Sequence, residues 1–133
     1  MKKVMAFGTF DIFHKGHESY LKQAKKAGDY LIAVVARDKT VLSVKNKKSG
    51  NSEQKRKRIL ENSRLADKVI LGSLGDKYAV IKKYRPDIIC LGYDQNAFVD
   101  KLKDKLRQFG LEKTRIEKLK PFYPKKYKSS LLV

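Results

Sequence analysis

Cysteine is almost absent from this chain of 133 residues, and its scarcity excludes two kinds of stabilising site. The one cysteine, Cys90, permits no internal disulfide, which fits a reducing compartment. Because the chain has only two histidines besides, it cannot supply the four ligands of a histidine–cysteine zinc site. Cys90 lies within the apolar run 88–91, so we predict a buried small hydrophobe and no nucleophile.

Long apolar runs and linker-like segments are also missing. No stretch approaches the roughly 20 apolar residues that a membrane-spanning helix needs, so we expect no membrane span. The N-terminus leads directly into an expected strand, which predicts no signal or transit segment and a cytoplasmic protein. Without repeats, low-complexity segments or Gly/Ser linkers, residues 1–133 are expected to form one domain.

Acidic residues are scarce, and the resulting positive charge points to binding of an anionic partner. The chain has 32 lysines and arginines against 14 acidic residues, a net charge of +18. Such an excess suggests a basic nucleic-acid-binding module. The cations are mostly scattered lysines, however, without an arginine-rich strip or interleaved aromatic residues. Two interpretations of the positive charge therefore stay open. One is specific recognition of nucleic acid by the surface, and the other is attraction of small anionic nucleotides toward a phosphate site.

Strand-like and helix-like patterns alternate along the chain, which predicts an α/β fold with a parallel sheet covered on both faces. From Lys39 to Ser52 the pattern weakens, and we expect a loop: either a basic flap over phosphates, with Lys45, Lys47 and Lys48, or an ordinary solvated loop. Ser52 is the expected N-cap of the helix that follows. Strands are predicted at 4–7, 30–36, 68–71, 87–91 and 114–119, and helices at about 17–27, 53–64, 76–84 and 98–109.

The first strand and the helix after it carry the most informative segment. A glycine, Gly8, ends the strand, and a loop with His14 and His17 opens the helix. A strand–loop–helix junction directs free main-chain N–H groups and the positive end of the helix at one point, which suits a phosphate. Gly8 and Gly16 would let a ligand approach the main chain, and both histidines can donate hydrogen bonds to an anion. The alternative is that the histidines merely cap the helix.

This junction resembles the signature of the cytidylyltransferase-like nucleotidyltransferases, with seven matches in Gly8-Thr9-Phe10-Asp11-x-x-His14-x-Gly16-His17. Members of that family join a nucleoside monophosphate unit to a phosphate acceptor and release pyrophosphate. The resemblance implies a Rossmann-like, doubly wound domain with a parallel five-stranded sheet, and it implies a homodimer.

The resemblance also assigns catalytic roles to four residues. His14 and His17 would face the α- and β-phosphates. Lys45 lies where the family places a lysine that stabilises the transition state, although Lys47 or Lys48 could take that place. Arg56 matches the arginine that contacts the nucleotide phosphates.

A wider set of residues is implied to bind the nucleotide. Mg²⁺ would bridge phosphate oxygens, and Asp11 is the candidate protein ligand. Asp94 would lie near the base or ribose, with helix capping as its alternative role, and the segment 128–130 resembles the family's closing serine motif. The implied nucleotide-binding residues are Gly8, Thr9, Phe10, Asp11, His14, Lys15, Gly16, His17, Gly92, Asp94, Tyr127, Ser129 and Ser130.

Within the family, three segments look most like the archaeal-type FAD synthases, which adenylate FMN with ATP and a divalent metal. These are residues 36–41, 71–74 and 86–95. The alternative is a glycerol-3-phosphate cytidylyltransferase using CTP, although those enzymes typically carry Gly-Asp-Asp-Trp where this chain has Gly92-Tyr93-Asp94-Gln95. The tail lacks the cysteines and final helix of the FAD synthases, which leaves the acceptor open and allows a relative without catalysis.

Overall fold

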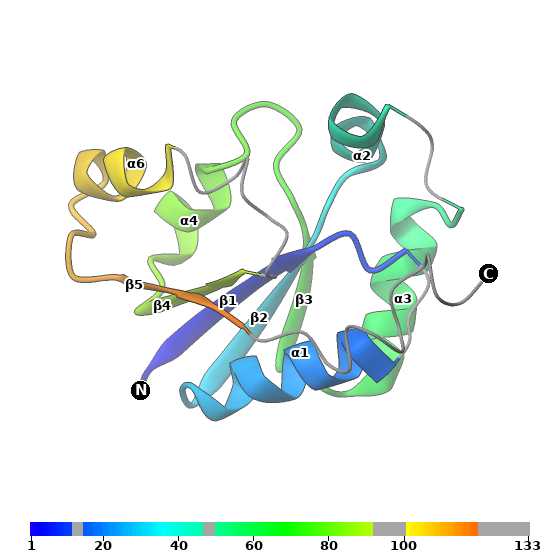
Figure 1. The fold of residues 1–133 in the computed structure, drawn as a ribbon, viewed down its shortest axis with the longest axis horizontal. Coiled ribbons are helices and arrows are strands. Elements are labelled where there is room, and N and C mark those ends of the chain that lie inside the picture. The colour runs from blue at the N-terminus through cyan, green and yellow to red at the C-terminus, as the bar shows by residue number, and fades with distance from the viewer. Residues whose placement is uncertain (12–14, 47–49, 92–100, 120–133) are drawn as a thin grey trace.

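A computed structural model of the chain describes residues 1–11, 15–46, 50–91 and 101–119 (Figure 1). Its core is a five-stranded sheet in the order β3-β2-β1-β4-β5, and every pair of neighbouring strands is parallel. The predicted α/β fold with a five-stranded parallel sheet is therefore confirmed. The strands are β1 Lys3–Gly8, β2 Tyr30–Val35, β3 Lys68–Leu71, β4 Ile88–Leu91 and β5 Arg115–Lys118.

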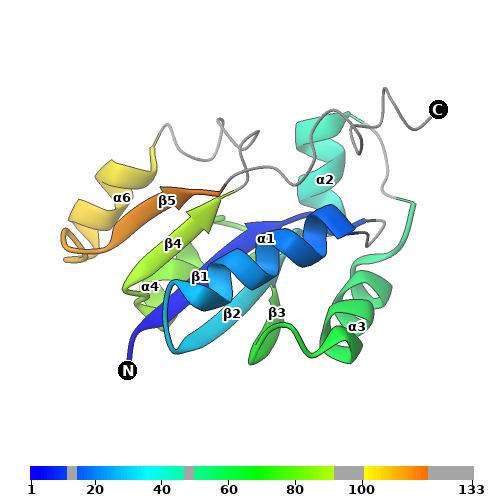
Figure 2. The same cartoon turned by 60° about the horizontal axis from the view of Figure 1, so that its bottom comes forward.

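Helices cover both faces of this sheet. Alternate strand residues point to opposite sides, so the apolar strands present an apolar surface on each face. On one face, Val4 and Ala6 of β1 belong to the core cluster that includes Leu21 of α1 and Leu60 of α3. On the other, Met5 and Phe7 pack with the buried residues of α4 and α6. The doubly wound arrangement is visible in Figures 1 and 2, with helices α1 Lys15–Lys26, α3 Glu53–Ser63, α4 Ala79–Tyr84 and α6 Leu102–Gln108.

A further helix, α2 (Asp38–Lys45), corrects the sequence prediction, which placed a loop from residue 39 onward. Figure 1 shows it beyond the carboxyl ends of the strands. Val41 is buried in it, whereas the next apolar residue, Leu42, is 45% exposed. Its N-terminus is held by Glu53, whose carboxylate accepts the Asp38 N–H at 2.8 Å. That bond comes from another helix, and local periodicity could not reveal it.

The strand order determines where a ligand can be received. The chain runs outward from β1 to β2 and β3, then returns to β4 on the other side of β1. In open α/β sheets, ligands bind outside the carboxyl ends of the strands at such a reversal of order. The loop after β1 lies at this point, as the signature requires. Among the described residues, no helix is both long and apolar enough to cross a bilayer.

Candidate functional site

The β1–α1 junction has the predicted geometry of strand, loop and helix. β1 ends at Gly8, and α1 begins at Lys15 and extends for 12 residues. Gly16 and His17 therefore lie in the first turn of α1, the part of a helix that can direct main-chain N–H groups at an anion. Lys15 is exposed beside them, and His17 is half-buried. The positive end of a helix is thus directed at the carboxyl edge of the sheet.

Phe10 explains why Gly8 must be a glycine. Its backbone is in the left-handed region, at φ 53°, and its side chain is only 3% exposed. A Cβ on Gly8 would lie 2.7 Å from the Phe10 ring, so a larger residue would collide with it. The ring meets His17 edge-on, with 5.4 Å between ring centroids. Phe10 thus packs against the imidazole of His17 from the interior of the protein.

Tyr20 ties the two strands at the reversal of strand order to α1. Its hydroxyl lies 2.9 Å from the carbonyl oxygen of Phe7 in β1 and 2.8 Å from that of Cys90 in β4. The Cys90 side chain is fully buried, as predicted, and burial raises the pKa of its thiol to about 12. The Tyr20 bonds therefore support the site by joining α1 to the sheet. The Cys90 thiol is not activated as a nucleophile, because its pKa is raised.

Arg56, the fourth residue of α3, is fully buried beneath the junction. Its guanidinium donates hydrogen bonds to three main-chain carbonyls: Nε to Asn51 at 3.1 Å and Nη1 to Thr9 and Ala36, both at 2.8 Å. Nη2 donates to the Asp38 carboxylate at 2.7 Å. Arg56 was predicted to contact phosphates. Here its donors are directed at the protein instead, at the loops that follow β1 and β2.

Asp38 and Glu53 connect the N-termini of α2 and α3 by a reciprocal pair of bonds. Glu53 accepts the Asp38 N–H, and Asp38 accepts the Glu53 N–H at 3.2 Å. Arg37 adds an ion pair to Glu53 at 2.6 Å and donates to the Gly72 carbonyl at 2.8 Å. The bond from the Asp38 N–H, followed by that from Arg37, lowers the pKa of Glu53. The charges hold the two helices and the end of β3 together.

The carboxylate of Asp11 is bound by main-chain donors from the segment before α3. One carboxylate oxygen accepts the Gly50 N–H at 2.7 Å, and the other accepts the Asn51 N–H at 2.8 Å. Asn51 returns a side-chain bond to the Asp11 carbonyl at 2.6 Å. Among the described residues, no group of three or more His, Cys, Asp or Glu side chains could hold a metal. The role of Asp11 as a metal ligand therefore stays a prediction.

The remaining predicted site residues divide into two groups. Thr9 contributes its carbonyl to Arg56, and Lys45 is the last residue of α2, with its side chain beyond what the structure describes. Other predicted residues lie wholly outside the described ranges: His14, Gly92, Asp94, Tyr127, Ser129 and Ser130.

Sequence reasoning missed four residues that build the support of the site: Arg37, Asp38, Asn51 and Glu53. Two signals could have indicated them. Asp38 closely follows the carboxyl end of β2, where α/β folds present ligand-site groups. Glu53 follows the N-cap Ser52, whose hydroxyl accepts the Lys55 N–H at 3.2 Å as predicted. Their pairing is not readable from sequence, because it joins two helices.

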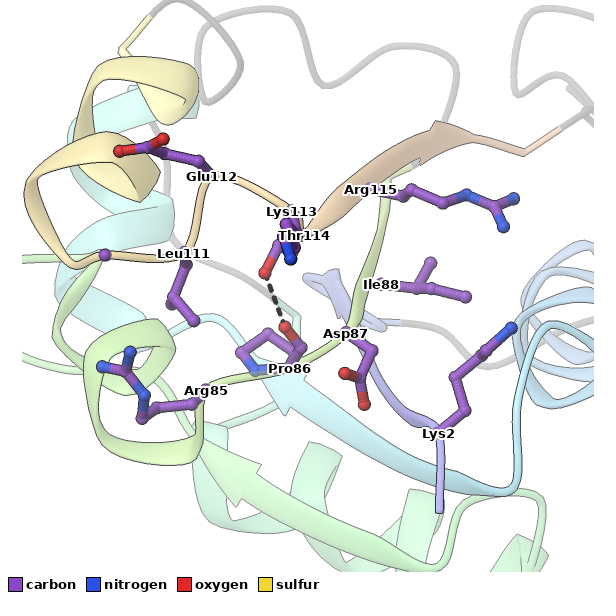
Figure 3. A pocket seen from close by; sticks show the side chains of 11 residues that line it. Lys2, Arg85, Pro86, Asp87, Ile88, Leu111, Glu112, Lys113, Thr114 and Arg115 are labelled. Carbon is purple, nitrogen blue, oxygen red and sulfur yellow. Dashed lines mark hydrogen bonds between the residues drawn. The ribbon is translucent and has the colours of Figure 1, made fainter.

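A groove of about 610 Å³ lies at the end of the sheet opposite the candidate site (Figure 3). It is lined by Lys2 before β1, Asp87 before β4 and Arg115 at the start of β5, among others. These positions mark the amino ends of the strands. Among the predicted site residues that the structure describes, none lines this groove, and it lies away from the β1–α1 junction.

Comparison with known proteins agrees with this geometry. The cytidylyltransferase-like family model matches residues 5–133. The FAD synthase of Ferroglobus placidus is 46% identical over 113 residues, which cover 84% of this chain and 72% of that protein. The FAD synthase of Aciduliprofundum boonei is 41% identical over 122 residues, which cover 92% of this chain and 80% of that protein.

A solved structure extends the agreement to three dimensions. The crystal structure of the lipopolysaccharide core biosynthesis protein from Thermoplasma volcanium superposes with a TM-score of 0.84 at 38% identity. The match covers 92% of this chain and 98% of that one. With its signature at the β1–α1 junction, its parallel sheet and these relatives, the chain belongs to the cytidylyltransferase-like family of nucleotidyltransferases.

Proposed function

We propose that this chain is an FMN adenylyltransferase, which transfers the adenylyl group of ATP to FMN and releases pyrophosphate. The observation that carries the proposal is the first turn of α1, with Gly16 and His17 at the reversal of strand order. The identity of 41–46% to proteins named FAD synthase selects the flavin acceptor. The net charge of +18 favours a reaction between two anions, which would otherwise repel one another.

The proposed reaction is an in-line displacement. A phosphate oxygen of FMN attacks the α-phosphorus of ATP, the new P–O bond forms, and the bond to the bridging oxygen of pyrophosphate breaks. The protein needs no covalent nucleophile, since positioning and neutralisation of charge supply the catalysis in this class of reaction. His17 and the first-turn N–H groups of α1 would hold the α- and β-phosphates, together with His14. Gly8, Thr9, Lys15 and Gly16 would line the same site.

Other proposed contacts come from more distant parts of the chain. Lys45, at the end of α2, would stabilise the charge on the leaving pyrophosphate. The binding role of Gly92, Asp94, Tyr127, Ser129 and Ser130 remains a proposal from the family resemblance. We assign Phe10 and Arg56 to support of the site in place of direct contact, because both are buried and directed at protein atoms.

Mg²⁺ is part of the proposal as a substrate-bound ion. When bound, it would neutralise the phosphate oxygens, which this hard cation prefers as ligands. We propose that the phosphates, in place of Asp11, supply most of its ligands, because the described residues contain no group of three or more His, Cys, Asp or Glu side chains that could hold a metal. We also propose that the protein is cytoplasmic and that it forms a homodimer. Gel filtration with light scattering would test the homodimer by its molar mass.

Transfer from CTP to glycerol 3-phosphate is the second candidate, because the matching family is named for cytidylyl transfer and this acceptor is the alternative from the sequence. The experiment incubates the protein with ATP and FMN, and separately with CTP and glycerol 3-phosphate, and measures pyrophosphate. The proposal predicts pyrophosphate from the first pair. Release from the second pair alone would transfer the assignment to the cytidylyl reaction. A nucleic-acid module predicts neither, and instead predicts steeply salt-dependent binding to duplex or RNA.

A further inference from the structure

We infer that Asp11 is a positioning residue: with Asn51 it clamps the segment before α3 onto the loop after β1, and it is no metal ligand. This inference deepens the proposed function and rests on it for its catalytic consequence. The clamp consists of three hydrogen bonds between residues that are 39 or 40 positions apart in sequence. All three bonds join residues outside the helices and strands, so they do not belong to the hydrogen bonding of the sheet or of a helix.

The geometry of the clamp is that of a carboxylate bound by two adjacent main-chain donors. The two Asp11 oxygens accept from Gly50 at 2.7 Å and from Asn51 at 2.8 Å. The Asn51 side chain closes the ring by donating to the Asp11 carbonyl at 2.6 Å. Hydrogen bonds to an ionised acceptor are short and about twice as strong as neutral ones. An ionised Asp11 therefore fits this set of donors.

Arg56 continues the clamp into the interior. It donates to the carbonyl of Asn51 on one side and to that of Thr9 on the other, so both clamped loops also share a buried cation. Its Nη2 reaches Asp38, the first residue of α2. The loop that carries the signature, the segment before α3 and the helix that carries Lys45 are thus joined through one connected set of bonds.

The catalytic consequence follows from this connection. The first turn of α1 and the end of α2 belong to separate parts of the chain, yet the proposed reaction needs both beside one triphosphate. A misplacement of about 1 Å in such a site can cost about 10²-fold in rate. The structure assigns to Asp11 the role of fixing that spacing, with no contact to the substrate.

The test compares Asp11→Asn, Asn51→Ala and the double variant with the unaltered protein. Asp11→Asn replaces an acceptor oxygen with an NH₂ group that faces an N–H donor. Asn51→Ala removes only the third contact and leaves the Asp11 carboxylate intact. Asp87→Asn is the matched control, because Asp87 also accepts a main-chain N–H, from Lys3 at 2.8 Å, but at the opposite edge of the sheet.

Two readouts are needed, and one is independent of catalysis. By hydrogen exchange, the amides of Gly50 and Asn51 should exchange about tenfold faster in Asp11→Asn and be unchanged in Asp87→Asn. By kinetics with ATP and FMN, kcat/KM should fall about 10²-fold in Asp11→Asn, while the Mg²⁺ concentration for half-maximal rate stays the same. Asn51→Ala should also raise the exchange rates and lower kcat/KM. In the double variant the fold-decrease in kcat/KM should be smaller than the product of the fold-decreases in the two single variants.

The contrary results are equally specific. A rise of about tenfold or more in the half-saturating Mg²⁺ concentration, with unaltered exchange at Gly50 and Asn51, would overturn the inference and make Asp11 a metal ligand. Unaltered exchange in both single variants would also overturn it, since no clamp would then exist. If no nucleotide pair yields pyrophosphate, the proposed function fails, but the exchange readout still decides the clamp. Should Asp11→Asn not fold, Asn51→Ala decides it by the same two measurements.

Discussion

Replacement of Arg56 by lysine probes the support beneath the site. The arginine sends hydrogen bonds to three main-chain carbonyls and to Asp38. A lysine ammonium keeps the charge but concentrates its donors at one point, so it cannot reproduce this fork. One or two buried carbonyls would lose their partner, at about 1–3 kcal/mol each, which predicts a loss of about 2–4 kcal/mol. The Asp38 side chain is 48% exposed, and hydration would offset the loss of its bond.

Urea unfolding followed by far-UV circular dichroism measures this loss. With a slope of about 1–3 kcal/mol per molar urea, the midpoint should fall by about 1–2 M. Arg58→Lys is the matched control, because Arg58 lies on the same helix and is exposed, and its change should stay within about 0.5 kcal/mol. Equal midpoints for the two variants would show that the buried guanidinium does not hold the loops, and would return Arg56 to the role of a phosphate contact.

Three further predictions address the site and its surroundings. His17→Ala should retain the urea midpoint and lose about 10²–10³ in kcat with ATP and FMN, as is usual for loss of one donor to a developing charge; unaltered turnover would remove His17 from the mechanism. Because its bond from the Asp38 N–H lowers the pKa of Glu53, the stability from this carboxylate is present above its unfolded-state pKa of about 4.3 and is lost as pH falls through the lowered folded value. Glu53→Gln should therefore flatten the stability profile below about pH 4.3 in urea titrations, and a profile parallel to that of the unaltered protein would contradict this. Cys90, buried and with a thiol pKa of about 12, should resist an aromatic disulfide reagent in the native protein and react after unfolding; rapid labelling of the native state would show that the strand opens.

The sequence allowed the sheet to be predicted because its strands are short apolar runs separated by helical periodicity. β3 has the predicted bounds, Lys68–Leu71, and β2 differs only in ending at Val35 instead of Ala36. The buried faces of α1 and α3 also follow from spacing, with Leu21, Ala24 and Leu60 in the core. These features depend on side chains close in sequence, where local pattern carries the information.

The support of the site could not be predicted in the same way. The start of α2 depends on a carboxylate 15 residues away. The family resemblance pointed to Asp11, within the signature, and to Arg56, outside it, but their partners lie in loops brought together only by the fold. The contacts of these two side chains thus depend on long-range hydrogen bonds, which a sequence motif does not contain.

The central claim is attack of the FMN phosphate on the α-phosphorus of ATP, and the fate of a labelled phosphorus tests it most directly. ATP labelled at the α-position should pass its label to the flavin dinucleotide, and ATP labelled at the γ-position should leave its label in pyrophosphate. Label from the γ-position in a flavin product, or a flavin that stays unlabelled from either position while CTP labels glycerol phosphate, would contradict the account.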